Sequence, residues 1–383
     1  MRDTLLGGLT PSDFLTRHWH KSPLRVQQAI PDFLGLLTPA EIKRLATHPT
    51  VQTRLILRQG KRWVLRHGPF RPIDFKTLPD KNWTVLVQEL NHWVPEGEAL
   101  LREFDFLPHA RLDDLMVSYA VPGGGVGPHF DSYDVFLLQG FGTRRWGIAE
   151  TEDLELLPDS DLKLLRRFSP QAQWDLEAGD MLYLPPHCAH DGVALSECFT
   201  YSIGFRAPTY QEWVEAFLDF LRDRLQVEGR YADPDLNLSV HPGEIPLALI
   251  AQVDRMLRQQ VRWTHQQVAE CVGRYLSEPK PHLFFEPAEE SLTLEAFGLR
   301  CLQQGLQLDP RSRLLFSGKV FYFNGDRFEL RRKGATQMRC LADTRKLSAG
   351  AMDPEFMKVL YDAWQAGWIK FFDSRIERLS HRA

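Results

Sequence analysis

GGGVGPHFDSYDVFLLQGFGTRRW is the sequence of residues 123–146. A Gly-rich turn precedes a histidine and a carboxylate one residue apart, His129 and Asp131, and Arg144 follows thirteen residues after the carboxylate. Side chains alternate between the two faces of a β-strand, so a strand at this point would present His129 and Asp131 on one face. The stretch therefore predicts a β-fold that holds an imidazole and a carboxylate together.

The same period of two continues over about residues 111–206. Short apolar runs separated by Gly, Pro and Asp are typical of strands joined by turns, and they read DDLMVSYAVP, YDVFLLQG, RRWGIAE, QAQWDLEAGDMLYLPP and CFTYSIGFRAP. Several short strands with turn signals indicate a β-sandwich or jelly roll. Upstream of them, the apolar spacing predicts helices in TPSDFLTRHW, with Thr10 or Ser12 as its cap, in LTPAEIKRLAT and in NWTVLVQELNHW.

From about residue 209 the apolar period becomes helical. Three helices are expected, in YQEWVEAFLDFLRDRLQ, IPLALIAQVDRMLRQQV and THQQVAECVGRYLSE. A Pro-rich segment near 279–287 marks a boundary. The remaining residues show a helix pattern, a hairpin with Asn324-Gly325 at its turn and a last helix pattern, which together predict a small α+β domain of winged-helix type.

Composition limits the class of protein. A chain of 383 residues is long enough for two or three domains. The net charge of −4 argues against a general nucleic-acid or membrane-surface protein. Five cysteines without a Cys-x-x-Cys pair argue against a disulfide framework or a thiolate zinc site, and favour the reducing cytoplasm. The first 21 residues contain no long apolar run, so we expect neither a signal peptide nor a membrane span.

A shared cation would explain the paired imidazole and carboxylate. A third ligand would come from elsewhere, and LPPHCAHDG offers His187 and His190. Two histidines and one carboxylate on one face of a metal form the facial triad of non-heme iron(II) oxygenases. With a period of two, only one of Arg144 and Arg145 points inward. A bidentate guanidinium there would bind the far carboxylate of a dicarboxylate co-substrate such as 2-oxoglutarate.

The sequence resembles the bacterial JmjC-type ribosomal oxygenases, which are 2-oxoglutarate-dependent arginine hydroxylases of the sixteenth protein of the large ribosomal subunit. The resemblance is specific over about residues 10–210 and looser beyond. The segments that carry it are FLTRHWHKSPL, NHW, DDLMVSYAVPGGGVGPHFDSYDVFLLQGFGTRRW, GDMLYLPPHCAHDG and YSIGFRAP. It implies a double-stranded β-helix of the cupin (JmjC) type, hence a mixed α/β protein, with iron(II) as cofactor and with 2-oxoglutarate and dioxygen as co-substrates.

The resemblance also implies roles for individual residues. The metal ligands would be His129, Asp131 and His190; His190 is preferred to His187 because the family's histidine directly precedes an acidic-Gly pair, here Asp191-Gly192. Arg144 would bind the 5-carboxylate of 2-oxoglutarate. Weaker candidates for hydrogen bonds around the co-substrate are Ser118 and Thr200.

Strand parity predicts a substrate pocket beside the metal. Asp114 and Met116 share a face with Ser118, Tyr133 lies two residues after Asp131, and Ser202 shares a face with Thr200. A carboxylate, an aromatic ring and a thioether suit a long cationic side chain. The alternatives are core packing for Met116 and Tyr133, and a solvated strand end for Asp114.

The domain prediction is a JmjC catalytic domain over 1–208, with the metal and 2-oxoglutarate site in 111–206, then a helical dimerisation region over 209–280 and a winged-helix-like domain over 288–383. The function expected is hydroxylation of an arginine side-chain carbon in a large-subunit ribosomal protein. Histidine hydroxylation, N-methyl demethylation and a non-enzymatic cupin-like binding module stay open as alternatives.

Three further features are considered, and two of them have both a structural and a functional interpretation. The apolar stripe of Trp213, Phe217, Phe220 and Leu221 is either intradomain core or a homodimer interface, and the resemblance favours the dimer. The basic stretch ELRRKGATQMR, residues 329–339, either touches ribosomal RNA or is a solvated face, and the solvated face is favoured. Trp146 is expected to anchor the core.

Overall fold

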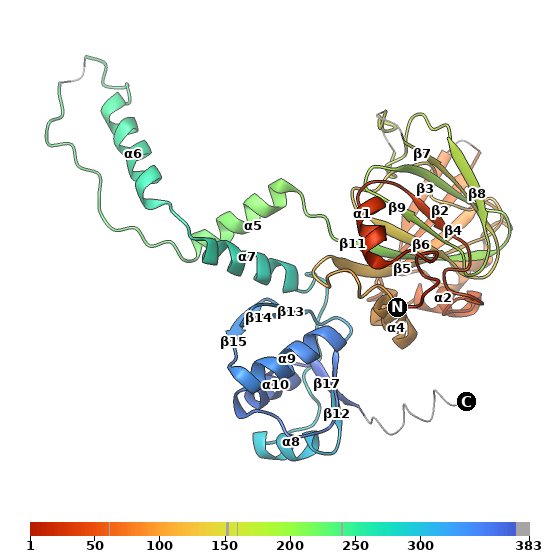
Figure 1. Cartoon of the computed structure of the whole chain (residues 1–383). Coiled ribbons are helices and arrows are strands. Elements are labelled where there is room, and N and C mark those ends of the chain that lie inside the picture. The colour runs from red at the N-terminus through yellow and green to blue at the C-terminus, as the bar shows by residue number, and fades with distance from the viewer. Residues whose placement is uncertain (61, 151–152, 159, 239, 373–383) are drawn as a thin grey trace. The chain divides into compact units, whose positions relative to one another are not determined.

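The computed structural model describes residues 1–372 apart from residues 61, 151–152, 159 and 239. The chain divides into two compact units, Met1–Ala207 and Pro208–Ala383 (Figure 1). Each unit has its own apolar core, so each is described by itself. No helix among the described residues is both long and apolar enough to cross a lipid bilayer.

Two antiparallel sheets form the first unit. The larger has eight strands in the order β1-β9-β6-β11-β5-β4-β2-β3, and the smaller has the order β10-β7-β8. The strands are β1 (Leu24–Val26), β2 (Thr53–Gln59), β3 (Arg62–His67), β4 (Trp83–Val87), β5 (Leu112–Ala120), β6 (Val135–Gln139), β7 (Arg144–Ala149), β8 (Ala172–Leu176), β9 (Met181–Leu184), β10 (Ala189–Ala194) and β11 (Cys198–Phe205). The helices are α1 (Pro11–Arg17), α2 (Pro39–Leu45), α3 (Pro72–Lys76), the 3₁₀ turn η1 (Leu90–His92) and α4 (Pro95–Arg102).

The larger sheet is covered on both faces. On one face, Val117 of β5 packs with Phe14 of α1 in the main apolar cluster. On the other face, Leu137 of β6 packs with Trp146 and Ile148 of the smaller sheet. Because side chains alternate along each strand, the residues that face the smaller sheet form a separate set from those that face the helices. This arrangement confirms the predicted jelly-roll core, and the space between the sheets is where the candidate site lies.

Several expected elements of the first unit are confirmed and one is wrong. Thr10 caps α1, as predicted, and the expected second helix is α2, where Thr38 makes a capping box. The helix expected in NWTVLVQELNHW is instead strand β4 followed by η1. All five residues of β4 are buried, and the strand pairs with β2 and β5. A continuous apolar run fits a strand buried on both faces, and its two neighbours satisfy its backbone.

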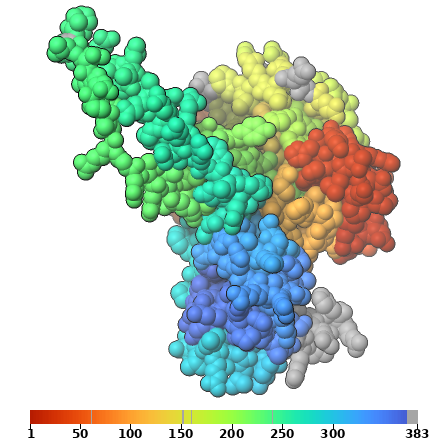
Figure 2. All heavy atoms as spheres, turned by 60° about the vertical axis from the view of Figure 1, so that its left-hand side comes forward, coloured from red at the N-terminus to blue at the C-terminus, as the bar shows by residue number. Residues whose placement is uncertain are grey.

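The second unit contains three helices and a winged-helix domain. The helices are α5 (Tyr210–Arg222), α6 (Leu247–Gln260) and α7 (His265–Ser277), where the sequence predicts them. The winged-helix domain comprises α8 (Leu294–Cys301), β12 (Gly305–Leu308), β13 (Leu314–Ser317), β14 (Val320–Phe323), β15 (Asp326–Glu329), α9 (Arg332–Thr344), β16 (Lys346–Leu347), α10 (Pro354–Gln365) and β17 (Ile369–Phe372). Asn324 and Gly325, with φ of +49° and +91°, turn the chain from β14 to β15, as predicted. Cyan to blue spheres in Figure 2 show this domain.

The apolar stripe of α5 packs mainly within its own unit. Phe220 and Leu221 are buried beside Cys271 of α7, and the ring of Trp213 lies 4.8 Å from that of Tyr275. These side chains thus contribute to an apolar cluster that α5 and α7 share. Other apolar side chains of the same helix stay exposed, and they are Tyr210, Val214 and Leu218.

Candidate metal and co-substrate site

Three side chains from two distant segments of the first unit converge between the two sheets. One ligand atom from each of His129, Asp131 and His190 lies within 4.8 Å of the others. Nε2 of His190 is 3.7 Å from Oδ2 of Asp131, and the two imidazole rings have centroids 4.2 Å apart. The backbones of His129 and His190 exchange two hydrogen bonds, of 2.9 and 2.8 Å. This single β-bridge is what brings the two histidines together.

Both histidines are oriented through Nδ1. Nδ1 of His129 is 2.8 Å from the carbonyl oxygen of Gly127, and Nδ1 of His190 is 2.9 Å from that of Cys188. A carbonyl only accepts, so the protonated nitrogen of each neutral ring is Nδ1. Nε2 of each ring then carries the free lone pair that a metal requires.

Burial keeps His190 neutral. The side chain is 2% exposed, and burial together with the neighbouring His129 lowers the pKa of His190 to about 4. Metal ions bind the neutral form of an imidazole, so this environment holds the residue in its ligand form at neutral pH.

Asp131 lies outside any regular strand, which corrects the expectation of a strand through residues 129–131. Only His129 makes a bridge, and the chain beyond it is irregular until β6 begins. The backbone N–H of His187 donates to the carbonyl of Asp131 over 2.7 Å. The ring of His187 is exposed and lies beside Phe130, 5.6 Å between centroids. His187 therefore supports the loop through its backbone, and its ring is not in the three-residue cluster.

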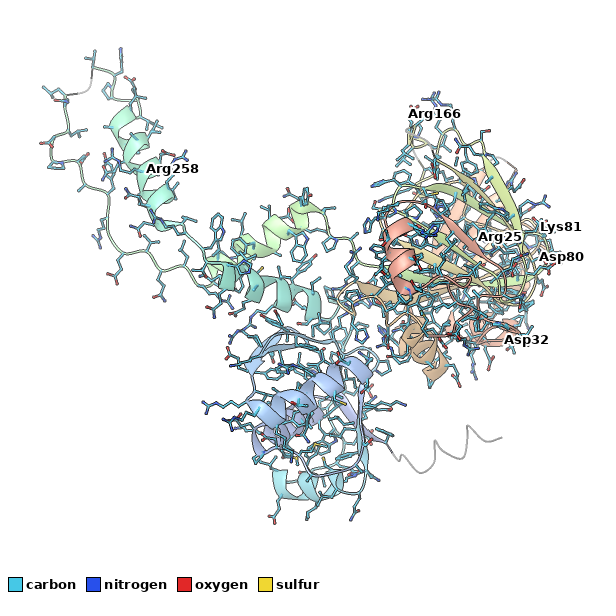
Figure 3. All side chains as sticks on the ribbon, in the orientation of Figure 1. Arg25, Asp32, Asp80, Lys81, Arg166 and Arg258 are labelled. Atoms are coloured by element: carbon cyan, nitrogen blue, oxygen red, sulfur yellow. The ribbon has the colours of Figure 1, made fainter. Side chains whose placement is uncertain are left out.

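Arg144 and Arg145 lie on opposite faces of β7. Arg145 pairs with Asp175 of the neighbouring strand over 2.6 Å in an exposed ion pair. Charged side chains such as Asp32, Lys81 and Arg166 also point outward from this unit (Figure 3). Arg144 is 4% exposed and faces the interior between the sheets.

The buried guanidinium of Arg144 is only partly satisfied. Its Nη1 donates to Oγ of Ser118 over 3.0 Å. Among the described residues, none accepts a hydrogen bond from Nε or Nη2. A buried charge with unpaired donors is costly unless a ligand pairs with it. The arrangement thus fits a carboxylate held by two parallel hydrogen bonds.

Trp146 links this guanidinium to the histidine cluster. Its ring centroid lies 5.8 Å from Cζ of Arg144 and also 5.8 Å from the ring of His190. The sequence predicts Trp146 only as a core residue. The parity of β7 could have identified its place at the site, because Trp146 shares the inward face with Arg144.

Ser118 and Thr200 sit opposite each other in the pairing of β5 with β11. Oγ1 of Thr200 donates to Oε1 of Gln139 over 3.0 Å, and Gln139 is fully buried. Gln139 was missed by sequence reasoning, although a glutamine that ends the apolar run YDVFLLQ is a signal. These polar groups line the large-sheet side of the space near Arg144.

Three of the four residues expected to contact the substrate, Asp114, Met116 and Ser202, lie further along β5 and β11, and the fourth, Tyr133, lies in the segment before β6. Asp114 is 8% exposed, and its Oδ2 accepts the backbone N–H of Glu89 over 3.1 Å. Met116 is half-buried and Ser202 is opposite to it in the ladder. Tyr133 is 40% exposed, so plain core packing does not describe it. Asp114 is buried, so it is not a solvated strand end.

A glycine and an arginine lie beside these residues, and sequence reasoning missed both. A Cβ placed on Gly204 would lie 3.6 Å from Oδ1 of Asp114 and 3.9 Å from Cε2 of Tyr133. The missing side chain leaves a gap between the carboxylate and the aromatic ring. Nη2 of Arg54 contacts Sδ of Met116 at 3.7 Å. Burial and the nearby carboxylates, with that of Asp131 foremost, raise the pKa of Tyr133, so the phenol stays protonated.

Models of known protein families match segments in both units. The JmjC domain model matches residues 99–213, and a ROXA-like winged-helix model matches residues 259–370. A model of the AraC-like ligand-binding domain matches residues 169–277, which begin in the segment before β8 and end in α7.

Relatives extend over nearly the whole chain. The ribosomal protein uL16 3-hydroxylase of Escherichia coli is 34% identical and covers 93% of this chain and 96% of its own length. A probable ribosomal oxygenase of Haemophilus influenzae is 38% identical over 63% of this chain and 58% of its own.

Solved structures of a relative superpose on nearly the whole chain. An X-ray structure of E. coli YcfD, 33% identical, superposes with a TM-score of 0.83 over 95% of this chain and 98% of that one. A YcfD structure with cobalt and 2-oxoglutarate, 32% identical, has a TM-score of 0.81 over the same shares of the chains. With this identity over nearly its whole length, the chain belongs to the JmjC-domain ribosomal oxygenases.

Proposed function

We propose that this protein is an iron(II)- and 2-oxoglutarate-dependent oxygenase that hydroxylates a side-chain carbon of an arginine in a large-subunit ribosomal protein. One observation carries the proposal. The buried guanidinium of Arg144 has two nitrogen atoms without a partner among the described residues, and it lies across Trp146 from the three-residue cluster around His190.

The residues present fit both groups. Two imidazoles and one carboxylate on one side of a shared point are the donor set of non-heme iron oxygenases, and they leave other coordination positions open. Arg144, oriented by Ser118, offers hydrogen-bond donors for the far carboxylate of 2-oxoglutarate. The relative whose structure contains cobalt and 2-oxoglutarate supports this assignment.

Bound iron(II), with 2-oxoglutarate and dioxygen, supplies the oxidising chemistry that puts one oxygen atom into a C–H bond. The chain supplies the geometry. His129, Asp131 and His190 would hold the metal, while Arg144 orients the co-substrate from the opposite end of the space. Apolar side chains between the sheets, such as Trp146, exclude bulk water from it.

The pocket beside the metal supports an arginine as the oxidised residue. Asp114 and Tyr133 approach the gap above Gly204, and Met116 and Ser202 lie on the same face of the sheet. A guanidinium can pair with the carboxylate and stack on the ring, while its methylene stem extends toward the metal. A neutral histidine needs no carboxylate. The name of the E. coli relative, a uL16 hydroxylase, supports a ribosomal substrate.

The deciding experiment is mass spectrometry of arginine-containing peptides from the sixteenth large-subunit protein. We expect a mass increase of one oxygen atom, located on an arginine carbon, that requires both iron(II) and 2-oxoglutarate. Oxygen on a histidine would instead show a histidine hydroxylase, and formaldehyde release would show a demethylase. No metal-dependent turnover of 2-oxoglutarate would leave the binding module as the function.

Assembly and location are part of the same proposal. Exposed apolar side chains on α5 and α6, such as Val214, Leu218 and Ile250, support a homodimer formed through the helical region 209–280. All five cysteines are free thiols, which supports action in the cytoplasm. The winged-helix-like domain over 288–383 has no assigned partner in this proposal.

A further inference from the structure

The segment that carries a metal ligand and a pocket wall is held by little regular structure. Residues 130–134 lie between the bridge at His129 and the start of β6, and they belong to no helix or strand. They carry both Asp131 and Tyr133. Without a ladder of backbone hydrogen bonds on both sides, the position of such a segment depends on its side-chain anchors.

Asp134 is the anchor at the end of this segment. Its side chain is fully buried, and Oδ1 accepts a 2.5 Å hydrogen bond from the hydroxyl of Tyr183 on β9. Nη2 of Arg111 lies 3.5 Å from Oδ2. Asp134 is thus buried among these partners, whereas its neighbour Tyr133 lies beside the gap at Gly204. The backbone carbonyl of Asp134 also accepts the N–H of Phe205, next to the gap at Gly204.

His20 completes the anchor from the N-terminal segment. Its Nε2 is 2.9 Å from Oδ2 of Asp134. Its backbone N–H lies 2.9 Å from the hydroxyl of Tyr183 and 3.3 Å from Oδ1 of Asp134. The residue has a φ of +58°, a left-handed conformation that L side chains seldom adopt, and its neighbours hold it there. His20 belongs to the segment FLTRHWHKSPL, and the proposed reaction gives that segment no role.

We infer that Asp134 and His20 are positioning residues for the substrate pocket, and that they act by fixing Tyr133 against Asp114. The inference rests on the proposed function, because the pocket is the one assigned to the target arginine. A carboxylate taken wholly out of water keeps its place only while its charged and hydrogen-bonded partners remain. Removing the partner His20 therefore loosens residues 130–134 and leaves the sheets and Arg144 in place.

The test uses the full chain with three variants and one matched control. His20→Ala removes the imidazole from a partly exposed position, and His20→Gln puts back a polar side chain with an N–H. Asp134→Asn keeps the shape of the anchor and removes its charge. His18→Ala is the control, because Nδ1 of this nearby histidine contacts Oγ of Ser22 at 3.1 Å rather than the Asp134 carboxylate.

The readouts are the peptide KM, the co-substrate KM, and hydrogen exchange of the backbone amides of residues 130–134. We expect His20→Ala and Asp134→Asn to raise the peptide KM about tenfold, the size expected when a buried charged anchor is disrupted. The co-substrate KM should stay at the wild-type value, and exchange should accelerate in residues 130–134. His20→Gln should recover most of the loss, and His18→Ala should behave as wild type.

Two results would overturn the inference. One is wild-type peptide KM and wild-type exchange in both His20→Ala and Asp134→Asn. The other is accelerated exchange throughout the first unit, which would show a purely structural role. If the wild-type protein hydroxylates no peptide, the proposed function fails, and local exchange at residues 130–134 still decides whether the anchor exists.

Discussion

Nη1 of Arg144 lies 3.0 Å from Oγ of Ser118, and this contact joins strand β7 of the smaller sheet to strand β5 of the larger one. The bond orients a buried guanidinium across the space between the sheets, and it leaves two other nitrogen atoms without a partner among the described residues. An anionic ligand at this position would gain charge-assisted hydrogen bonds that water does not supply there.

The two adjacent arginines should therefore differ sharply. Arg144→Met should raise the co-substrate KM by about a hundredfold, since a buried bidentate pair is lost and the carboxylate is left unpaired. Arg145→Met removes only the exposed ion pair with Asp175 and should change this KM by less than about twofold. Steady-state kinetics with varied 2-oxoglutarate measures both. Similar effects of the two changes would contradict the assignment of Arg144.

The metal ligands can be separated from their neighbour His187. His129→Ala, Asp131→Ala and His190→Ala should each abolish metal-dependent turnover of 2-oxoglutarate and weaken metal binding by at least about tenfold, because a ligand is lost. His187→Ala should keep both, since the backbone N–H that holds Asp131 remains. Calorimetric titration with iron(II) or cobalt(II) measures binding directly. An inactive His187→Ala beside an active His190→Ala would show that the third ligand is misassigned.

The metal-free protein should lose stability in acid through His190. Burial lowers its pKa to about 4 in the folded chain, whereas the unfolded chain has the ordinary value near 6.5. Between these pH values only the unfolded state binds a proton at this residue, so the free energy of unfolding falls as the pH drops from 6.5 to 4. Above pH 6.5 the imidazole is neutral in both states, and His190 causes no loss of stability. The loss is at most about 3 kcal/mol.

Urea unfolding of metal-free wild type and His190→Gln across this pH window measures the effect. The wild type should lose more stability than the variant, because glutamine does not titrate. Parallel pH dependences for the two proteins would assign the acid sensitivity to other groups.

Asp114 should decide the recognition of the target arginine. Asp114→Asn keeps an acceptor for the N–H of Glu89 but removes the charge, and it should cost peptide hydroxylation about 2–5 kcal/mol in kcat/KM. Binding of 2-oxoglutarate should survive. Asp113→Asn is the matched control, since Asp113 pairs with Arg206 at 3.4 Å. Mass spectrometry of the peptide product gives the rates. Undiminished hydroxylation by Asp114→Asn would argue against arginine as the target.

The exposed face of α5 should contain the dimer contact. Leu218→Asp places a charge among apolar side chains that are themselves exposed, and it should shift the protein from dimer to monomer at micromolar concentration. Gln211→Asp introduces the same charge at a polar position of the same helix and should leave the dimer intact. Light scattering distinguishes the two states. A monomeric wild-type protein would refute the proposed assembly.

Local patterns identified much of this protein because they depend on neighbouring residues. The cap at Thr10, the turn at Asn324-Gly325 and the helices α5, α6 and α7 follow from short-range hydrogen bonding and helical spacing. The pair His129-x-Asp131 is also a local pattern, since two side chains one residue apart are enough to suggest a shared cation.

Long-range pairing decided the rest. Whether residues 83–87 form a helix or a strand depended on β2 and β5, which satisfy the backbone of β4 on both sides. The role of Gln139 required the register of β6 against β11, and the gap at Gly204 required Asp114 and Tyr133 to converge from other segments. His20 meets Asp134 only because the fold brings the N-terminal segment to β6. Strand pairing and buried ion pairs bring together residues that are distant in the sequence, so periodicity and spacing do not predict these contacts.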